Sequence, residues 1–173
     1  YGTSGSGKIN GGAAADTVDG GDGNDQISGG GGNDSLDGGS GNDVVRGDGG
    51  DDIGIWRYSQ NKGAVDYYDG GGNSDLLKLH FAIGEWAQSD VQSEIARLLD
   101  FMATEAGPNS DGHLFTMQLH DARLDIRNWE NLEIYVDNVK IDPVGNDAPF
   151  IGAADKSASV TEIADEAPGE NTT

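Results

Sequence analysis

The sequence predicts a mostly β fold, in which a parallel β-roll (a β-solenoid) packs against antiparallel strands and one α-helix. Three observations predict it. A nine-residue pattern repeats in the first third of the chain, alternating apolar segments follow, and one amphipathic segment lies among them. Regular short repeats are typical of solenoids, and apolar residues spaced three and four apart are typical of a helix.

The repeat has the form Gly-Gly-x-Gly-x-Asp-x-U-x, where U is aliphatic. It is clearest in residues 20–28, 29–37 and 38–46, with weaker copies at 2–10, 11–19, 47–55 and 70–78. Glycines permit the tight turns, and the three residues x-U-x form a short strand whose U side chain points inward. A flexible glycine-rich linker would not keep an aspartate and an aliphatic residue in phase over five units.

Two units complete one coil, so units two apart stack on each other. The predicted pairs of stacked aspartates are Asp16 with Asp34, Asp25 with Asp43, and Asp34 with Asp52. Carboxylates and inward-facing carbonyls supply the six to eight oxygen ligands that calcium prefers. The sequence therefore predicts about four to six calcium ions between the turns. Their predicted ligands are Asp16, Asp25, Asp34, Asp43, Asp52 and Asp75.

The chain is strongly acidic, with a formal net charge of -21 and no cysteine. Residues 1–55 hold ten aspartates but only two bases, Lys8 and Arg46. The segment has few aliphatic residues, and their burial cannot offset the repulsion between carboxylates and the loss of chain entropy. We therefore expect this segment to fold only with calcium. Such a surface repels phosphates, which argues against nucleic acid or an anionic membrane as partner.

The composition changes after residue 55, and we expect three segments. Residues 1–55 form the calcium roll, residues 56–142 add a β-rich layer to the same compact domain, and residues 143–173 are a linker with the start of the next β-sandwich repeat. The layer contains one helix at residues 89–105. Its expected strands are residues 64–68, 76–81, 114–119, 123–127 and 132–141, the last three antiparallel.

A candidate ligand site lies where the repeats end. Aromatic walls with a few polar groups are typical of binding sites, and the residues concerned are Trp56, Tyr58, Tyr67, Tyr68 and Asp69. The alternative is that these rings pack the roll against the second layer. We expect Trp86 and Trp129 in the core. The three histidines lack the spacing of a zinc hydrolase, and no catalytic motif appears, so we expect a protein that is not an enzyme.

The nonapeptides resemble those of the RTX (repeats-in-toxin) superfamily. Together with Asn-Asp-Ala-Pro at residues 146–149, they resemble giant bacterial RTX adhesins, and the layout is similar to the peptide-binding module of those proteins. That resemblance implies one-step secretion to the cell surface, attachment to other cells, and a calcium-dependent pocket for a peptide C-terminus or a cell-surface protein. Neighbouring β-sandwich domains would flank it. A carbohydrate-binding RTX module, which should carry a basic stripe, and a structural RTX spacer are the alternatives.

Overall fold

The computed structural model describes residues 5–104 and 113–141, whose strands form two six-stranded sheets. Sheet 1 contains, in spatial order, β1 (Lys8–Gly12), β3 (Gln26–Gly31), β5 (Val44–Gly49), β7 (Val65–Asp69), β10 (Arg123–Arg127) and β9 (Leu114–Gln118). Sheet 2 contains β12 (Val139–Ile141), β11 (Asn131–Val136), β8 (Leu76–Phe81), β6 (Ile53–Arg57), β4 (Ser35–Asp37) and β2 (Thr17–Asp19). The expectation of a mostly β protein with parallel strands is confirmed.

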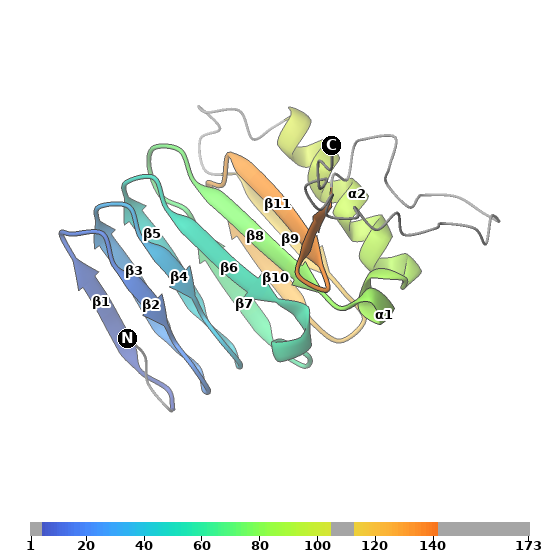
Figure 1. Ribbon diagram of the computed structural model, residues 1–173, viewed down its shortest axis with the longest axis horizontal. Helices are drawn as coiled ribbons and strands as arrows, with labels where there is room; N and C mark the ends of the chain where they lie inside the picture. Colours follow the sequence, from blue (N-terminus) through green and yellow to red (C-terminus); the bar gives the residue numbers. More distant parts are fainter. Residues whose placement is uncertain (1–4, 105–112, 142–173) are drawn as a thin grey trace, which may run out of the picture.

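The chain alternates between the two sheets. We call one sheet 1 strand and the sheet 2 strand that follows it a coil, so the coils are β1–β2, β3–β4, β5–β6, β7–β8 and β10–β11. Every pairing between coils is parallel, whereas β9 and β12 pair antiparallel with β10 and β11. The coils follow one another in chain order from blue β1 to orange β11 (Figure 1).

The core lies between the sheets and is built from aligned side chains. In sheet 1 the buried row runs through Ile9, Ile27, Val45, Tyr68 and Ile126. In sheet 2 the repeat loses its aliphatic residue at Gly54. A Cβ at Gly54 would lie 2.6 Å from the ring of Trp129, so that ring occupies the place of the missing side chain. Trp129 and Trp86 are both buried, as expected.

The parallel coils continue beyond the nonapeptides, which differs from the expected arrangement. Strands β10 and β11 fall within segments expected to be antiparallel, yet β10 pairs parallel with β7 and β11 pairs parallel with β8. Only β9 and β12 add antiparallel edges. The reason is physical: β7–β8 and β10–β11 keep the alternation of buried and exposed residues that lets another coil stack on the previous one.

Helical segments interrupt the coils on one side. The 3-10 helix η1 (Tyr58–Gln60) precedes β7, and α1 (Ile83–Trp86) and α2 (Ser89–Thr104) lie between β8 and β9. Helix α2 matches the predicted helix, whose last residue, 105, lies outside the described residues. Val91, Ile95 and Leu98 face the core, at the end of the molecule far from β1 (Figure 1).

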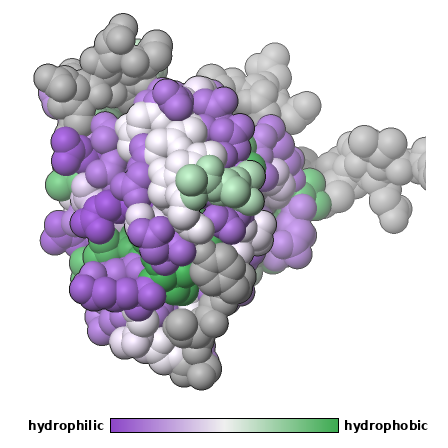
Figure 2. Space-filling model, turned by 90° about the vertical axis from the view of Figure 1, so that its left-hand side faces the viewer, coloured by the Kyte–Doolittle hydropathy of each residue, from purple (hydrophilic) through white to green (hydrophobic). Residues whose placement is uncertain are grey.

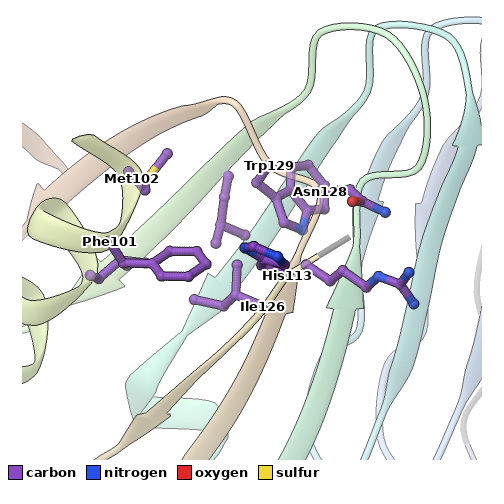
Figure 3. Close-up of a pocket in the computed structure, with 9 residues that line it drawn as sticks. Phe101, Met102, His113, Ile126, Asn128 and Trp129 are labelled. Atoms are coloured by element: carbon purple, nitrogen blue, oxygen red, sulfur yellow. The ribbon is translucent and has the colours of Figure 1, made fainter. Parts of the chain in front are cut away.

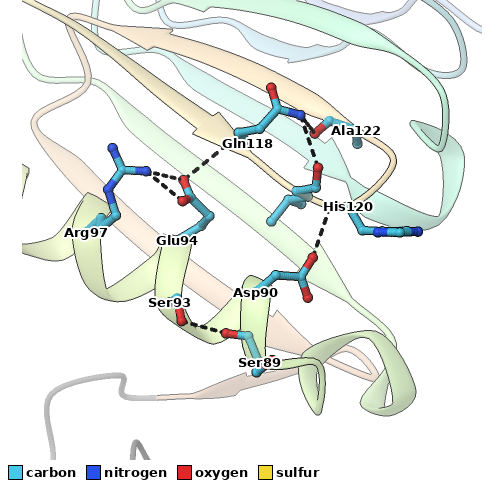
Figure 4. A network of polar contacts seen from close by, with 9 residues as sticks. Ser89, Asp90, Ser93, Glu94, Arg97, Gln118, His120 and Ala122 are labelled. Atoms are coloured by element: carbon cyan, nitrogen blue, oxygen red, sulfur yellow. Dashed lines mark hydrogen bonds and ion pairs between the residues drawn. The ribbon is translucent and has the colours of Figure 1, made fainter.

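Helix α2 is joined to the edge strand β9 by its acidic side chains. Glu94 accepts a 3.1 Å hydrogen bond from the Gln118 N–H, and Asp90 accepts one of 2.9 Å from the His120 N–H (Figure 4). Arg97 pairs with Glu94 at 2.6 Å. These bonds occupy N–H groups that an edge strand would otherwise expose.

The opposite end, which carries β1 and β2, presents mostly hydrophilic side chains with a smaller hydrophobic area (Figure 2). Among the described residues, no helix is long and apolar enough to cross a membrane. The expected linker and β-sandwich start at residues 143–173 lie outside the described residues, so that expectation stays a prediction.

Candidate calcium centre

Acidic side chains form two ladders along the sides of the coils. The long ladder follows the turns that lead from sheet 1 to sheet 2, and its members are Asp16, Asp34, Asp52, Asp75 and Glu130. The short ladder follows the turns that lead from sheet 2 to sheet 1, and its members are Asp25, Asp43 and Asp66. In both, the main-chain N–H of one member donates to a carboxylate oxygen of the next.

The hydrogen bonds of the long ladder are uniform. The N–H groups of Asp16, Asp34 and Asp52 each donate to Oδ1 of the next aspartate at 2.8 Å. The last step has the same length, from the Asp75 N–H to Glu130 Oε2. The stacking of Asp16 with Asp34 and of Asp34 with Asp52 is thus confirmed, and so is that of Asp25 with Asp43.

Insertions explain why one ladder is longer. Successive partners are 18 residues apart within the nonapeptides, 23 apart from Asp43 to Asp66 and from Asp52 to Asp75, and 55 apart from Asp75 to Glu130. Segment 58–64 and the helices with β9 all enter on the side of the short ladder. The turns of the long ladder therefore stay compact through all five coils.

The second carboxylate oxygen of several ladder members lacks a partner. Oδ2 of Asp34, Asp52 and Asp75 is buried and forms no hydrogen bond within residues 5–104 and 113–141. Burying a carboxylate oxygen without a partner costs free energy, and a cation bound at these atoms would remove that cost. Among the described residues, no three His, Cys, Asp or Glu side chains gather to hold a metal by themselves, so main-chain oxygens must share the task.

Backbone carbonyls converge on the same places. A Cβ at Gly29 would clash with both Asp34 Oδ2 and the carbonyl oxygen of Gly47 in the next coil. A Cβ at Gly47 would likewise meet Asp52 Oδ2 and the Gly70 carbonyl. We call each such place a cradle. In a cradle, a carboxylate oxygen and a carbonyl oxygen lie beside a glycine, whose lack of a side chain leaves the space between them open. This donor set fits a hard, oxygen-preferring cation.

Burial also changes the acidity of the ladder. Asp43 and Asp75 each have a pKa raised to about 7; desolvation is the largest cause, neighbouring carboxylates act in the same direction, and a backbone N–H donor acts against it. Burial raises the pKa of Asp66 to about 6, against hydrogen bonds from the Asp43 N–H and Trp56. Without a cation these carboxyl groups retain protons near neutral pH, so protons compete with the metal.

Parallel sheets joined by glycine turns, with stacked aspartates along the turns, define a class of repeat protein that binds a hard cation in its turns. Residues 1–36 and 19–53 match the family model of the RTX calcium-binding nonapeptide repeat (4 copies). RTX nonapeptide repeats bind calcium, which is therefore the cation of these turns. The match covers less than half of the chain, so it identifies the repeats rather than the family of the whole chain.

RTX repeats occur in secreted bacterial proteins and are typically structural or binding elements. Comparisons with the curated proteins and with the solved structures gave no match.

The five residues of the expected ligand site do not come together at the surface. Trp56, Tyr58 and Tyr68 are between 0 % and 1 % exposed and belong to the core, so in this structure they present no surface to a ligand. The packing alternative holds for these three, because the apolar rows of the coils continue through them. Tyr67 and Asp69 point outward from β7, and the Tyr67 hydroxyl donates to Asp69 at 3.0 Å.

Sequence reasoning missed two ladder members, Asp66 and Glu130. Both carry a local signal, because Asp66-Tyr67-Tyr68 and Glu130-Asn131-Leu132 each have an acid two residues before a large apolar residue. Neither segment has the glycines of the nonapeptide, so the pattern was not recognised. Only the register, which aligns Asn131 with Leu76 and Leu132 with Leu77, puts Glu130 in phase with Asp75.

A small crevice lies beside the coil β10–β11. It is lined by Phe101 and Met102 of α2, by Ile126, and by the turn residues Asn128 and Trp129 (Figure 3). Its walls are largely apolar, and it adjoins the core rather than the ladders.

Proposed function

We propose that the chain is a calcium-bound β-roll that serves as a ligand-binding module of a large secreted bacterial surface adhesin and attaches the cell to other cells. Its favoured ligand is a peptide, bound through a free C-terminus. The proposal gives the module no catalytic role. The observation that carries it is the outer face of sheet 1, which holds four basic residues and a tyrosine ring in a chain whose formal net charge is -21.

That surface, which we call the sheet 1 face, follows from the register. Because the aligned row from Ile9 to Ile126 is buried, the residues on either side of it in each strand point outward. Four of the ten lysines and arginines lie on this face: Lys8, Arg46, Arg123 and Arg127. Asp48, Asp69 and Asp125 lie on it as well, and Asp125 pairs with Arg123 at 2.8 Å.

The centre of the sheet 1 face combines charge with an aromatic ring. In the register Arg46 is aligned with Asp69, and Asp69 with Arg127. The guanidinium of Arg46 lies 5.9 Å from the centre of the Tyr67 ring. Arginine presents a planar fork that matches a carboxylate, and an adjacent ring gives a peptide side chain an apolar contact. A peptide C-terminus therefore fits this face.

Calcium would control this surface by ordering the turns that lie next to its residues in the sequence. Arg46 follows the ladder member Asp43 by three residues, and Tyr67 directly follows Asp66. The position of both side chains depends on ordered turns, so ligand binding should require calcium.

The test is capture of immobilised peptides with free or amidated C-termini, in calcium and in chelator. The double substitution Arg46→Gln with Arg127→Gln should abolish calcium-dependent capture, whereas Arg97→Gln, which changes an exposed arginine of α2, should leave it intact. Equal capture of amidated peptides, or full capture by the double variant, would refute the proposed mode of binding.

An acidic carbohydrate is the second candidate, and the same face favours it. Four of the ten bases lie on the sheet 1 face, although the chain as a whole is strongly acidic. A glycan array run beside the peptides separates the two ligands: capture by uronate-containing glycans alone would favour the carbohydrate module. Absence of calcium-dependent capture in both formats would favour a structural spacer.

A further inference from the structure

The turn between β10 and β11 closes the long ladder with a glutamate instead of an aspartate. Asn128 and Glu130 are two positions apart in the sequence, whereas Gly70 and Asp75 of the preceding turn are five positions apart. The longer glutamate side chain still reaches the ladder, because its Oε2 accepts the Asp75 N–H at 2.8 Å. This turn lies far beyond residue 53, where the nonapeptide match ends.

The atoms around this turn reproduce the cradles of the repeats. A Cβ at Gly70 would lie 2.6 Å from Asp75 Oδ2 and would clash with the carbonyl oxygen of Asn128. In the repeats the corresponding pair is an aspartate Oδ2 and a glycine carbonyl. Asn128 takes the glycine's place and has a φ of 54°, a left-handed conformation that asparagine tolerates better than most residues.

Among the described residues, only backbone N–H groups compensate these carboxylates: Asp75 Oδ1 accepts the Asp52 N–H and Glu130 Oε2 accepts the Asp75 N–H, each at 2.8 Å. Asp75 is 0 % exposed, and its Oδ2 forms no hydrogen bond with any part of the chain that the structure describes. Among the described residues, neither Asp75 nor Glu130 forms an ion pair with a lysine or arginine. Two adjacent carboxylates, one of them fully buried, repel each other unless a cation lies between them.

We propose that Asp75, Glu130 and the carbonyl oxygen of Asn128 form a calcium site outside the nonapeptide repeats. This ion would join the coil β10–β11, which follows the helical insertion, to the coil β7–β8. Calcium would then fasten the non-repeat end of the molecule as well as the repeats. The inference is independent of the ligand that the sheet 1 face recognises.

The competing explanation is that Glu130 only caps the Asp75 N–H. Glu130→Gln separates the two, because its amide oxygen still accepts that hydrogen bond while its negative charge is gone. Glu133→Gln is the matched control, since Glu133 lies on the same strand, β11, and pairs with Lys140 and Lys78 away from the ladder.

Native mass spectrometry at a calcium concentration that saturates the parent chain should show one ion fewer in Glu130→Gln and no change in Glu133→Gln. Terbium gives a second measurement, because Trp129 lies between two of the proposed ligands and should sensitise the bound ion. Its emission should fall in Glu130→Gln and in Trp129→Phe. An unchanged ion count together with unchanged emission in Glu130→Gln would show that Glu130 is only a cap.

Crystals of the parent chain soaked in terbium keep the proposal testable if Glu130→Gln does not fold. An anomalous peak between Asp75 Oδ2 and the Glu130 carboxylate would support the site. Peaks between Asp34 and Asp52 without one at Asp75 would overturn it.

Discussion

Trp56 Nε1 donates a 2.7 Å hydrogen bond to Oδ2 of Asp66 within the core. Asp66 is the last member of the short ladder, and Asp34, Asp52 and Asp75 of the long ladder have no such donor at Oδ2. The Trp56 N–H therefore occupies the place beside Asp66 Oδ2 that a cation could take beside the Oδ2 atoms of the long ladder. The short ladder ends in a hydrogen bond, and its side chains need no calcium beyond this point.

Replacing Trp56 should consequently destabilise the fold without removing a calcium ion. Trp56→Phe leaves Asp66 Oδ2 buried and without a donor, which costs about 1–3 kcal/mol in addition to the lost packing. Urea unfolding in saturating calcium measures the free energy of unfolding. Trp86→Phe is the control, because Trp86 Nε1 has no hydrogen-bond partner among the described residues. Equal losses in both variants would show that the hydrogen bond contributes nothing.

Removal of calcium should unfold the repeats. The ladders place buried carboxylates in stacked turns, and only a cation compensates both their repulsion and their desolvation. Each site adds about 2.7 kcal/mol when free calcium is a hundred times its dissociation constant. Far-UV circular dichroism should show loss of the β signal in chelator and its return with calcium but not with magnesium. An identical β signal in excess chelator would contradict this expectation.

The calcium-free chain should become more stable as the pH falls. The folded-state pKa values of Asp43 and Asp75, about 7, lie above the ordinary value of 3.8. A raised carboxyl pKa contributes stability that is complete below about pH 4 and is lost as the pH rises through about 7.

Protein freed of calcium by dialysis should therefore gain β structure between about pH 7 and pH 4. In saturating calcium the trend should reverse, because protons displace the ion from the same carboxylates. Thermal unfolding followed across this pH range, with and without calcium, measures both trends. A calcium-free chain that loses structure on acidification would contradict the sign.

The cradles can be tested by adding one methyl group. Gly29→Ala places a Cβ against Asp34 Oδ2 and the Gly47 carbonyl, so it should weaken calcium binding and lower the melting temperature in calcium. Gly31→Ala lies on the same strand, β3, and its Cβ would meet only Ala13 Cα, at 3.9 Å. Calorimetric titration with calcium measures both variants. Equal affinities would mean that the space beside Gly29 holds no ion.

The printed sequence alone predicts the repeat, the cation and most strand positions. The phase of aspartate and aliphatic residue is local, since each nonapeptide forms one turn and one short strand, so reading units two apart gave the correct stacking of Asp25 with Asp43. The amphipathic period similarly located the helix that begins at Ser89. These features depend on residues close together in the chain.

How far the coils extend, and which side chains they bury, follows only from the pairing of strands that are far apart in the sequence. Glu130 follows Asp75 by 55 positions, and no local period spans an insertion that contains two helices and a strand. Likewise, the aromatic cluster at Trp56 looked like a binding surface because a ring can face the core or the solvent. The parallel pairing with neighbouring strands fixes that choice, because it aligns Tyr68 with Val45 and Ile126 in the buried row and leaves Tyr67 outside.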